Sequence, residues 1–143
     1  MKIKNLLLVA FIAVMAVACG PKEPKDIIQK KWTLDAIDTT ELIKKLPPEQ
    51  VEMFKKMFGE VMTKLKGKAT QEFKAEGKYQ SYTMGPDNQW KTVDGTWELS
   101  ADNKTLTIKS NERPEVYTIK EITNEHLSLE AEGLVMKFVP KED

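Results

Sequence analysis

Two side chains in this sequence could carry reactive chemistry, and each residue type occurs only once: Cys19 and His126. A single cysteine forms neither an intramolecular disulfide nor a CxxC pair, and a single histidine lacks the partners of an HxxH or HExxH metal site. The carboxylates are scattered opposite lysines, which does not indicate the acid pair of a glycosidase. We therefore predict no enzymatic activity, no metal and no cofactor, and we interpret His126 as a turn or surface residue.

Cys19 follows an N-terminal segment with the features of an export signal. Lys2 and Lys4 form a basic start, and the apolar run over residues 6–17 has the length of a signal-peptide core. A membrane-spanning helix needs about 20 apolar residues, so this run is too short to remain as an anchor. Residues 1–18 are therefore predicted to be a cleaved signal peptide.

The cleavage site resembles the lipobox of bacterial lipoproteins, at which the signal is cut and the cysteine sulfur is acylated with chains such as palmitate. The residues that carry the likeness are Ala16-Val17-Ala18-Cys19. Ala16 stands where Leu or Val is usual, so the tripeptide also fits the A-x-A site of ordinary secretion. Because a lone cysteine at the first mature position otherwise has no role, we predict that Cys19 is lipidated and is the protein's membrane anchor.

The residues after the cysteine predict a tether and a location. Segment 19–26 contains two prolines, a glycine and alternating charges, a composition typical of a short extended spacer. By resemblance to the sorting rules of other lipoproteins, Gly20 in place of an aspartate does not favour retention in the inner membrane. The expected location is the cell envelope, on the periplasmic face of the outer membrane.

Charge and length limit the remaining possibilities. The 143-residue chain has 22 basic and 22 acidic residues, and the signal would remove only two of the basic ones. A nucleic-acid-binding protein would show a concentrated basic surplus, so no nucleic-acid partner is predicted. The length is ordinary for one domain with one core.

The first elements after the tether are predicted as a strand and two helices. Residues 31–37 alternate between apolar and polar types around Trp32 and Leu34, as in a half-buried strand. Thr39 or Thr40 can cap a short helix, and the second helix that follows the Pro47-Pro48 pair bears an apolar stripe. We therefore predict a helical insert over residues 40–66 after the first strand.

Short strands separated by turns are expected from residue 67 onward. Turn residues at 76–77, 85–88, 101–104 and 132–133 separate segments with a two-residue apolar period. Short antiparallel strands without a long crossover remove their exposed edges by closing. We predict an all-β fold, an up-and-down antiparallel barrel of about eight strands with the two-helix insert.

Several spaced landmarks resemble the lipocalin-like domain found in bacterial lipoproteins. These are Ile27-Ile28 with Trp32, Phe73 with Gly77 and Tyr79, Gly95-Thr96-Trp97-Glu98-Leu99, Asp102-Asn103-Lys104-Thr105-Leu106, Tyr117-Thr118-Ile119 and Leu127-Ser128-Leu129. The resemblance implies a barrel domain over residues 27–140 with an interior pocket. Lys30 departs from the family pattern, in which a glycine is usual, and the inserted helices are then expected to cover that end of the barrel.

Large side chains at inward-type positions are the candidate ligand-binding residues. An eight-stranded barrel is either filled by side chains or holds one small ligand, and both alternatives stay open for these rings. The predicted inward set has no ionisable group, which favours an apolar or amphipathic ligand; the alternative is a filled barrel that docks an unidentified protein partner. The candidate residues, with Met57 as part of a helical cover, are Trp32, Leu34, Met57, Phe73, Tyr79, Trp97, Leu99, Tyr117 and Phe138.

Overall fold

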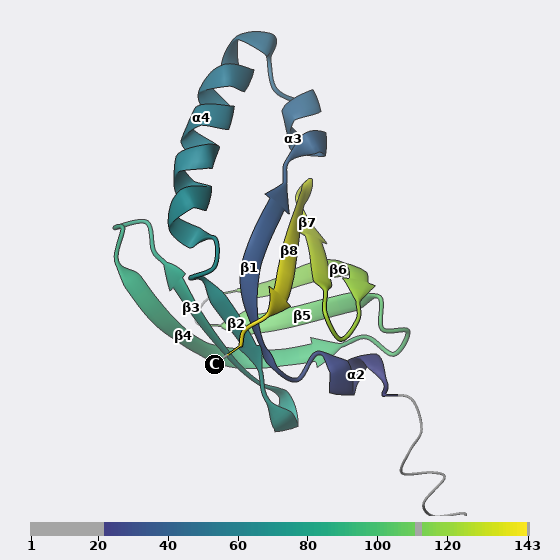
Figure 1. Ribbon diagram of the computed structural model, residues 1–143. Helices are drawn as coiled ribbons and strands as arrows, with labels where there is room; N and C mark the ends of the chain where they lie inside the picture. Colours follow the sequence, from purple (N-terminus) through teal and green to yellow (C-terminus); the bar gives the residue numbers. More distant parts are fainter. Residues whose placement is uncertain (1–21, 111–112, 143) are drawn as a thin grey trace, which may run out of the picture.

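The computed structural model describes residues 22–110 and 113–142 (Figure 1). The predicted signal peptide and Cys19 lie outside these residues. Among the described residues, no helix is both long enough and apolar enough to cross a membrane.

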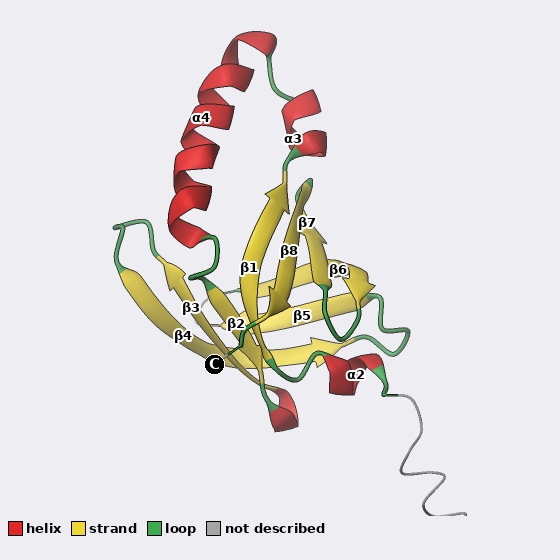
Figure 2. Ribbon diagram, viewed as in Figure 1, coloured by secondary structure: helices red, strands yellow, loops and turns green. Residues whose placement is uncertain are grey.

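Eight antiparallel strands form a closed barrel in which each strand pairs with the next and the last pairs with the first (Figure 2). The predicted all-β up-and-down barrel is confirmed. The strands are β1 (Lys31–Asp38), β2 (Thr70–Phe73), β3 (Lys78–Met84), β4 (Trp90–Leu99), β5 (Thr105–Ser110), β6 (Pro114–Ile122), β7 (Leu127–Ala131) and β8 (Leu134–Pro140). The closing β1–β8 ladder has a bulge between Leu34 and Ala36.

The turns between strands form where the sequence has turn residues. Between β7 and β8, Glu132 and Gly133 both have positive φ, 52° and 81°, as a tight two-residue hairpin turn requires. Asn103 has φ 57° in the β4–β5 turn, where asparagine tolerates the left-handed region. Short connections of this kind hold each strand beside its chain neighbour.

A short helix lies at the lower end of the barrel, the end at which β1 begins (Figure 1). This helix, α2 (Pro24–Ile27), starts with a proline at its first turn, where the missing N–H costs nothing. Ile28, the next residue, is fully buried, and its carbonyl accepts a 2.9 Å hydrogen bond from the Trp32 indole N–H. The predicted extended tether therefore ends before Pro24. Ile27 is the last residue of α2 and Ile28 follows it, so neither belongs to the first strand.

Lys30 is accommodated at the same end without a glycine. Its Nζ lies 5.1 Å from the centroid of the Trp32 ring and donates a 3.1 Å hydrogen bond to the Asn124 carbonyl. The expectation that the inserted helices cover this end is wrong. They follow the other end of β1 and project from the opposite end of the barrel (Figure 2).

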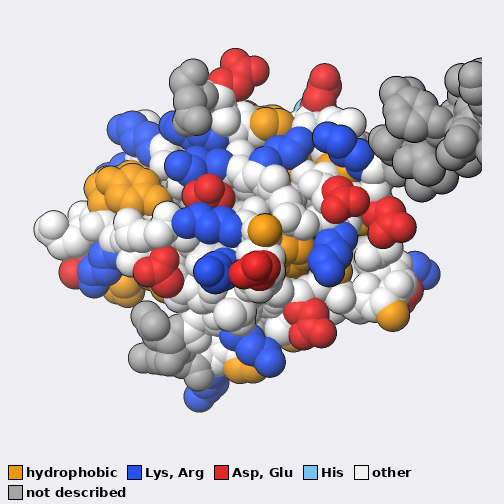
Figure 3. Space-filling view, turned by 90° about the horizontal axis from the view of Figure 1, so that it is seen from below, with side chains coloured by type: hydrophobic (Ala, Val, Ile, Leu, Met, Phe, Trp, Pro, Cys, Tyr) orange, Lys and Arg blue, Asp and Glu red, His pale blue; other side chains and the backbone are white. Residues whose placement is uncertain are grey.

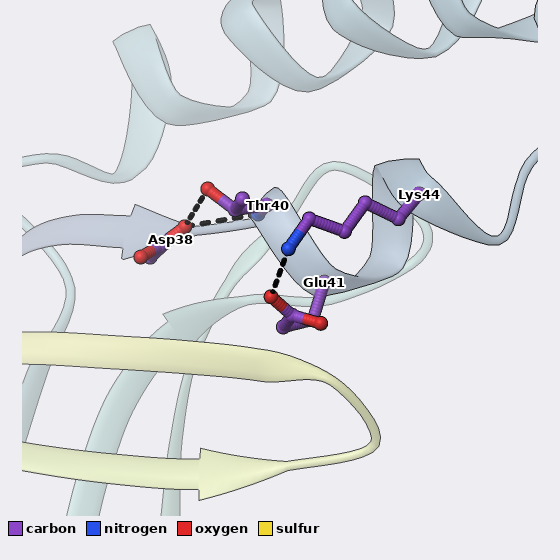
Figure 4. A network of polar contacts seen from close by, with 4 residues as sticks. All are labelled: Asp38, Thr40, Glu41 and Lys44. Atoms are coloured by element: carbon purple, nitrogen blue, oxygen red, sulfur yellow. Dashed lines mark hydrogen bonds and ion pairs between the residues drawn. The ribbon is translucent and has the colours of Figure 1, made fainter.

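The insert consists of α3 (Thr40–Lys44) and α4 (Pro48–Leu65), within the residues predicted for it. The side chain that caps α3 is that of Asp38 rather than Thr39 or Thr40, because Asp38 Oδ1 accepts bonds from the Thr40 amide at 2.9 Å and hydroxyl at 2.6 Å (Figure 4). The hydroxyl bond, more than the amide bond, lowers the pKa of Asp38 below its usual range. One turn on, Lys44 pairs with Glu41 at 2.7 Å.

The core fills the lower half of the barrel. Phe73 lies between Tyr79 and Trp97, with ring centroids 5.4 and 5.8 Å apart and the Trp97 contact edge-on. The Trp97 indole N–H donates to the Lys74 carbonyl at 2.9 Å, so this buried polar group is satisfied. The buried apolar residues are Ile28, Trp32, Leu34, Ala69, Phe73, Tyr79, Trp97, Leu106, Ile108, Leu127, Leu129 and Phe138.

The two chain ends leave the barrel together at this lower end. The amide of Lys141, just after β8, donates to the carbonyl of Lys31, the first residue of β1, at 2.9 Å. Seen from below, this end carries basic and acidic side chains interspersed (Figure 3). At the upper end, which carries α3 and α4, the barrel interior holds a cavity in place of a packed core.

Candidate ligand-binding cavity

A cavity of about 340 Å³ lies inside the upper half of the barrel, above the packed rings. One part of its wall is apolar and comes from β1, α4, the residue just before β2, β4, β5 and β8. These apolar residues are Leu34, Ile37, Leu65, Ala69, Val93, Ile108, Met136 and Phe138. The polar part comes from β2, β3, β5 and β6 and consists of Thr70, Gln71, Tyr79, Ser81, Thr83, Ser110, Glu115 and Tyr117.

Strand alternation explains why the wall changes character along β3. Tyr79, Ser81 and Thr83 share the inward face because side chains two residues apart point the same way. On the outward face, Tyr82 stacks on Trp90 of β4 with ring centroids 4.9 Å apart. The inward residues therefore pass from a large ring in the core to small hydroxyl side chains around the cavity.

β6 places a carboxylate at the cavity. Glu115 and Tyr117 both line it, and the Tyr117 hydroxyl donates to Glu115 Oε2 at 2.5 Å. Burial, followed by this hydrogen bond, raises the pKa of Tyr117 well above its usual value. The prediction of an inward set without ionisable groups is therefore wrong. Alternation on β6 would have identified the carboxylate, because Tyr117 points inward while Val116, 59% exposed, points outward.

Gln71 supplies the second distinctive group of the cavity. Its side-chain oxygen Oε1 is buried and has no hydrogen-bond partner within the described residues. Buried polar atoms in proteins are nearly always paired, and each exception calls for an explanation. Gln71 was not among the predicted site residues, although it stands two positions before the inward-facing Phe73 on the same strand.

Tyr79 lies at the boundary between the core and the cavity. Its side chain is buried, and desolvation, partly offset by a hydrogen bond with Ser81, raises its pKa to about 12. The hydroxyl therefore stays protonated at neutral pH and can donate or accept a hydrogen bond.

Four of the predicted site residues line the cavity: Leu34, Tyr79, Tyr117 and Phe138. Their proposed contact with a ligand stays a prediction. Sequence periodicity identified these positions because each lies on the inward face of its strand.

The other predicted residues do not line the cavity. Trp32, Phe73 and Trp97 are buried in the core below it, and Leu99 packs against that core. Met57 is 58% exposed on α4, whereas the same helix contributes Leu65 to the cavity wall. The predicted cover by Met57 is not present because α4 projects beyond the barrel rather than lying across it (Figure 1).

His126 lies in the β6–β7 turn, exposed, where its backbone amide bonds to the Thr123 hydroxyl at 3.0 Å. No group of three or more histidine, cysteine, aspartate or glutamate side chains within the described residues is placed to hold a metal ion.

A closed meander of eight strands with a cavity toward one end defines a class of small barrel proteins whose interior is wide enough for one ligand. Residues 28–129 match the model of the lipocalin-like domain, and the chain belongs to this family. The resemblance noted in the sequence is thereby confirmed.

Two solved structures show the same fold. A lipocalin-like protein from Bacteroides uniformis is similar with a TM-score of 0.53 and 13% identity, covering 80% of this chain and 99% of its own. An uncharacterized protein from Bacteroides eggerthii is similar with a TM-score of 0.51 and 14% identity over the same shares. No functionally curated protein shows significant similarity to this chain.

Proposed function

We propose that this protein is an envelope lipoprotein that holds one small amphipathic molecule in its barrel. The observation that carries the proposal is the cavity of about 340 Å³, whose lining combines apolar side chains with a set of polar groups. Small-molecule sites are typically concave and mostly apolar, with a few polar groups that orient the ligand, and their volumes start at about 300 Å³. Both properties favour a bound molecule over a filled barrel.

Native mass spectrometry of the protein extracted from its own envelope tests this proposal. One small molecule per chain should be retained by the wild type and lost from Met136→Trp, because a larger side chain at this lining position fills the cavity. Val116→Trp is the matched control, since Val116 points outward on β6. A wild-type protein that carries no extra mass and also binds no added amphiphile would contradict the proposal.

The proposed membrane attachment is through acyl chains on Cys19. Several chains, each contributing about 0.8 kcal/mol per buried methylene, anchor a protein firmly. Because the described chain enters the barrel at the α2 end, this anchor would leave the end with the helices pointing away from the bilayer (Figure 1).

Metabolic labelling tests the anchor. Labelled palmitate should enter the wild-type protein and the protein should partition with membranes, whereas Cys19→Ala should appear in the soluble periplasm. Membrane association that is unchanged in Cys19→Ala would contradict the lipid anchor.

A second candidate function, docking of a protein partner, is favoured by one surface of α4. Met53, Met57 and Val61 are 68%, 58% and 48% exposed and lie four residues apart, on one face of the helix. A photocrosslinking residue at Met57 should then trap one defined partner in the envelope, and the same residue at Thr92, on the outer face of β4, should not. No adduct at Met57 would contradict docking through this face.

A further inference from the structure

The described lining of the cavity carries a negative charge and no positive charge. Among the described residues, Glu115 is the only carboxylate in its lining, and no lysine, arginine or histidine lines it. Glu115 is exposed at the wall, so the carboxylate keeps contact with water while its Oε2 accepts the Tyr117 hydroxyl. The cavity therefore presents negative charge to anything that enters it.

The neighbouring basic groups do not reverse this sign. Lys91 of β4 forms an ion pair with Asp87 at 3.0 Å, and Lys120 of β6 pairs with Glu130 at 3.1 Å. Arg113 lines an outer groove together with Glu115, Glu130 and Glu132, three carboxylates against one cation, and it does not line the cavity. An anionic headgroup inside would therefore meet a carboxylate without a lining cation.

Gln71, like Glu115, presents a hydrogen-bond acceptor to the cavity. The Gln71 Oε1 atom is buried without a hydrogen-bond partner in the described residues, so a ligand group that donates to it would remove the cost of an unpaired acceptor. The remaining polar lining consists of hydroxyls, including those of Ser81 and Ser110, which both donate and accept. The two groups that can only accept, the Glu115 carboxylate and Gln71 Oε1, therefore favour a ligand that donates hydrogen bonds.

We infer that the bound molecule is a cationic amphiphile, a protonated amine on an apolar body. The ammonium group pairs with Glu115, a donor on the ligand reaches Gln71, and the apolar body lies against Leu34, Met136 and Phe138. This inference deepens the proposed function and rests on it. The structure supplies the acceptors and the charge for such a headgroup within one cavity.

Three probes with the same ten-carbon chain and different headgroups separate the alternatives: decylamine, decanol and decanoate, each below its micellar concentration. Isothermal titration of the full-length protein at neutral pH and low salt should give about fivefold tighter binding of decylamine than of decanol, as expected for one partly solvated ion pair. Decanoate should bind more weakly than decanol. Raising the salt to about 1 M should reduce the amine preference, because screening then acts within about 3 Å.

Glu115→Gln should abolish the preference for decylamine while leaving decanol binding in place, since the amide keeps the shape and can still accept from Tyr117. Glu98→Gln is the matched control, because Glu98 is exposed on β4, away from the cavity, and loses the same charge. Circular dichroism verifies that both variants are folded.

The outcomes distinguish this inference from the proposed function. Decanoate binding as tightly as decylamine, or a preference for decylamine unchanged in Glu115→Gln, overturns the cationic headgroup and leaves the binding proposal standing. Failure of all three probes to bind, together with no ligand in the native mass spectrum, overturns both.

Discussion

We expect Gln71 to contribute to the proposed binding site at a cost in stability. An unpaired buried acceptor costs about 1–3 kcal/mol, and replacing it by an apolar group of similar shape removes that cost. Gln71→Leu should therefore raise the free energy of unfolding of the ligand-free protein by about 1 kcal/mol and weaken binding of decylamine. Urea denaturation and titration measure the two effects. A less stable Gln71→Leu protein would show that Gln71 supports the fold rather than a ligand.

Tyr79 predicts a loss of stability in alkali. Its pKa in the folded protein is about 12, above the usual value of about 10, so its stabilising contribution is complete below pH ~10 and disappears as the pH rises through ~12. The upward shift corresponds to roughly 2–3 kcal/mol. Between pH 10 and 12, Tyr79→Phe should lose less stability than the wild type, as measured by urea denaturation. Tyr82→Phe, an exposed outer-face ring, is the control and should behave like the wild type.

At the scale of elements, the barrel strands and α4 depend on different interactions. None of the residues of α4 is buried, whereas β7 buries Leu127, Ser128 and Leu129 in succession. Phe54 and Phe58 stack within α4 at 5.6 Å, which supports the helix locally without fixing it to the barrel.

This difference predicts unequal hydrogen exchange. Amides in the middle of α4 should exchange faster than those of β7, because an exposed helix opens by local unfolding at a smaller free energy than the closed barrel. Hydrogen-exchange mass spectrometry compares the two segments in one experiment. Equal protection would mean that α4 is held by contacts not present in this structure, as a bound partner would provide.

At the scale of the whole molecule, the core below the cavity should dominate stability. Trp32→Ala should cost about 3–5 kcal/mol, since Trp32 is fully buried. Tyr82→Ala, which removes an exposed outer-face ring stacked on Trp90, should cost less than about 1.5 kcal/mol. Denaturant unfolding of the two variants measures both values. Similar losses would contradict the separation of a packed lower half from an open upper half.

Most of the barrel could be predicted from the sequence because its signals are local. Alternation around Trp32 and turn residues such as Glu132-Gly133 give strands and hairpins directly. Helix α2 was missed because four residues that begin with a proline are too short to show a period. The division of inward side chains into core and cavity was also missed. It depends on how the closed strands tilt past one another, which a two-residue period does not contain.

The hydrogen bond between Lys141 and Lys31 has a consequence for the connectivity of the barrel. Because the entry and exit points of the chain touch, a circular permutant can join them with a short linker and begin instead at the exposed Pro47-Pro48 connection. All eight strand pairings would be kept, and the new termini would lie beyond the barrel among the helices. The barrel architecture therefore does not depend on which strand comes first in the sequence.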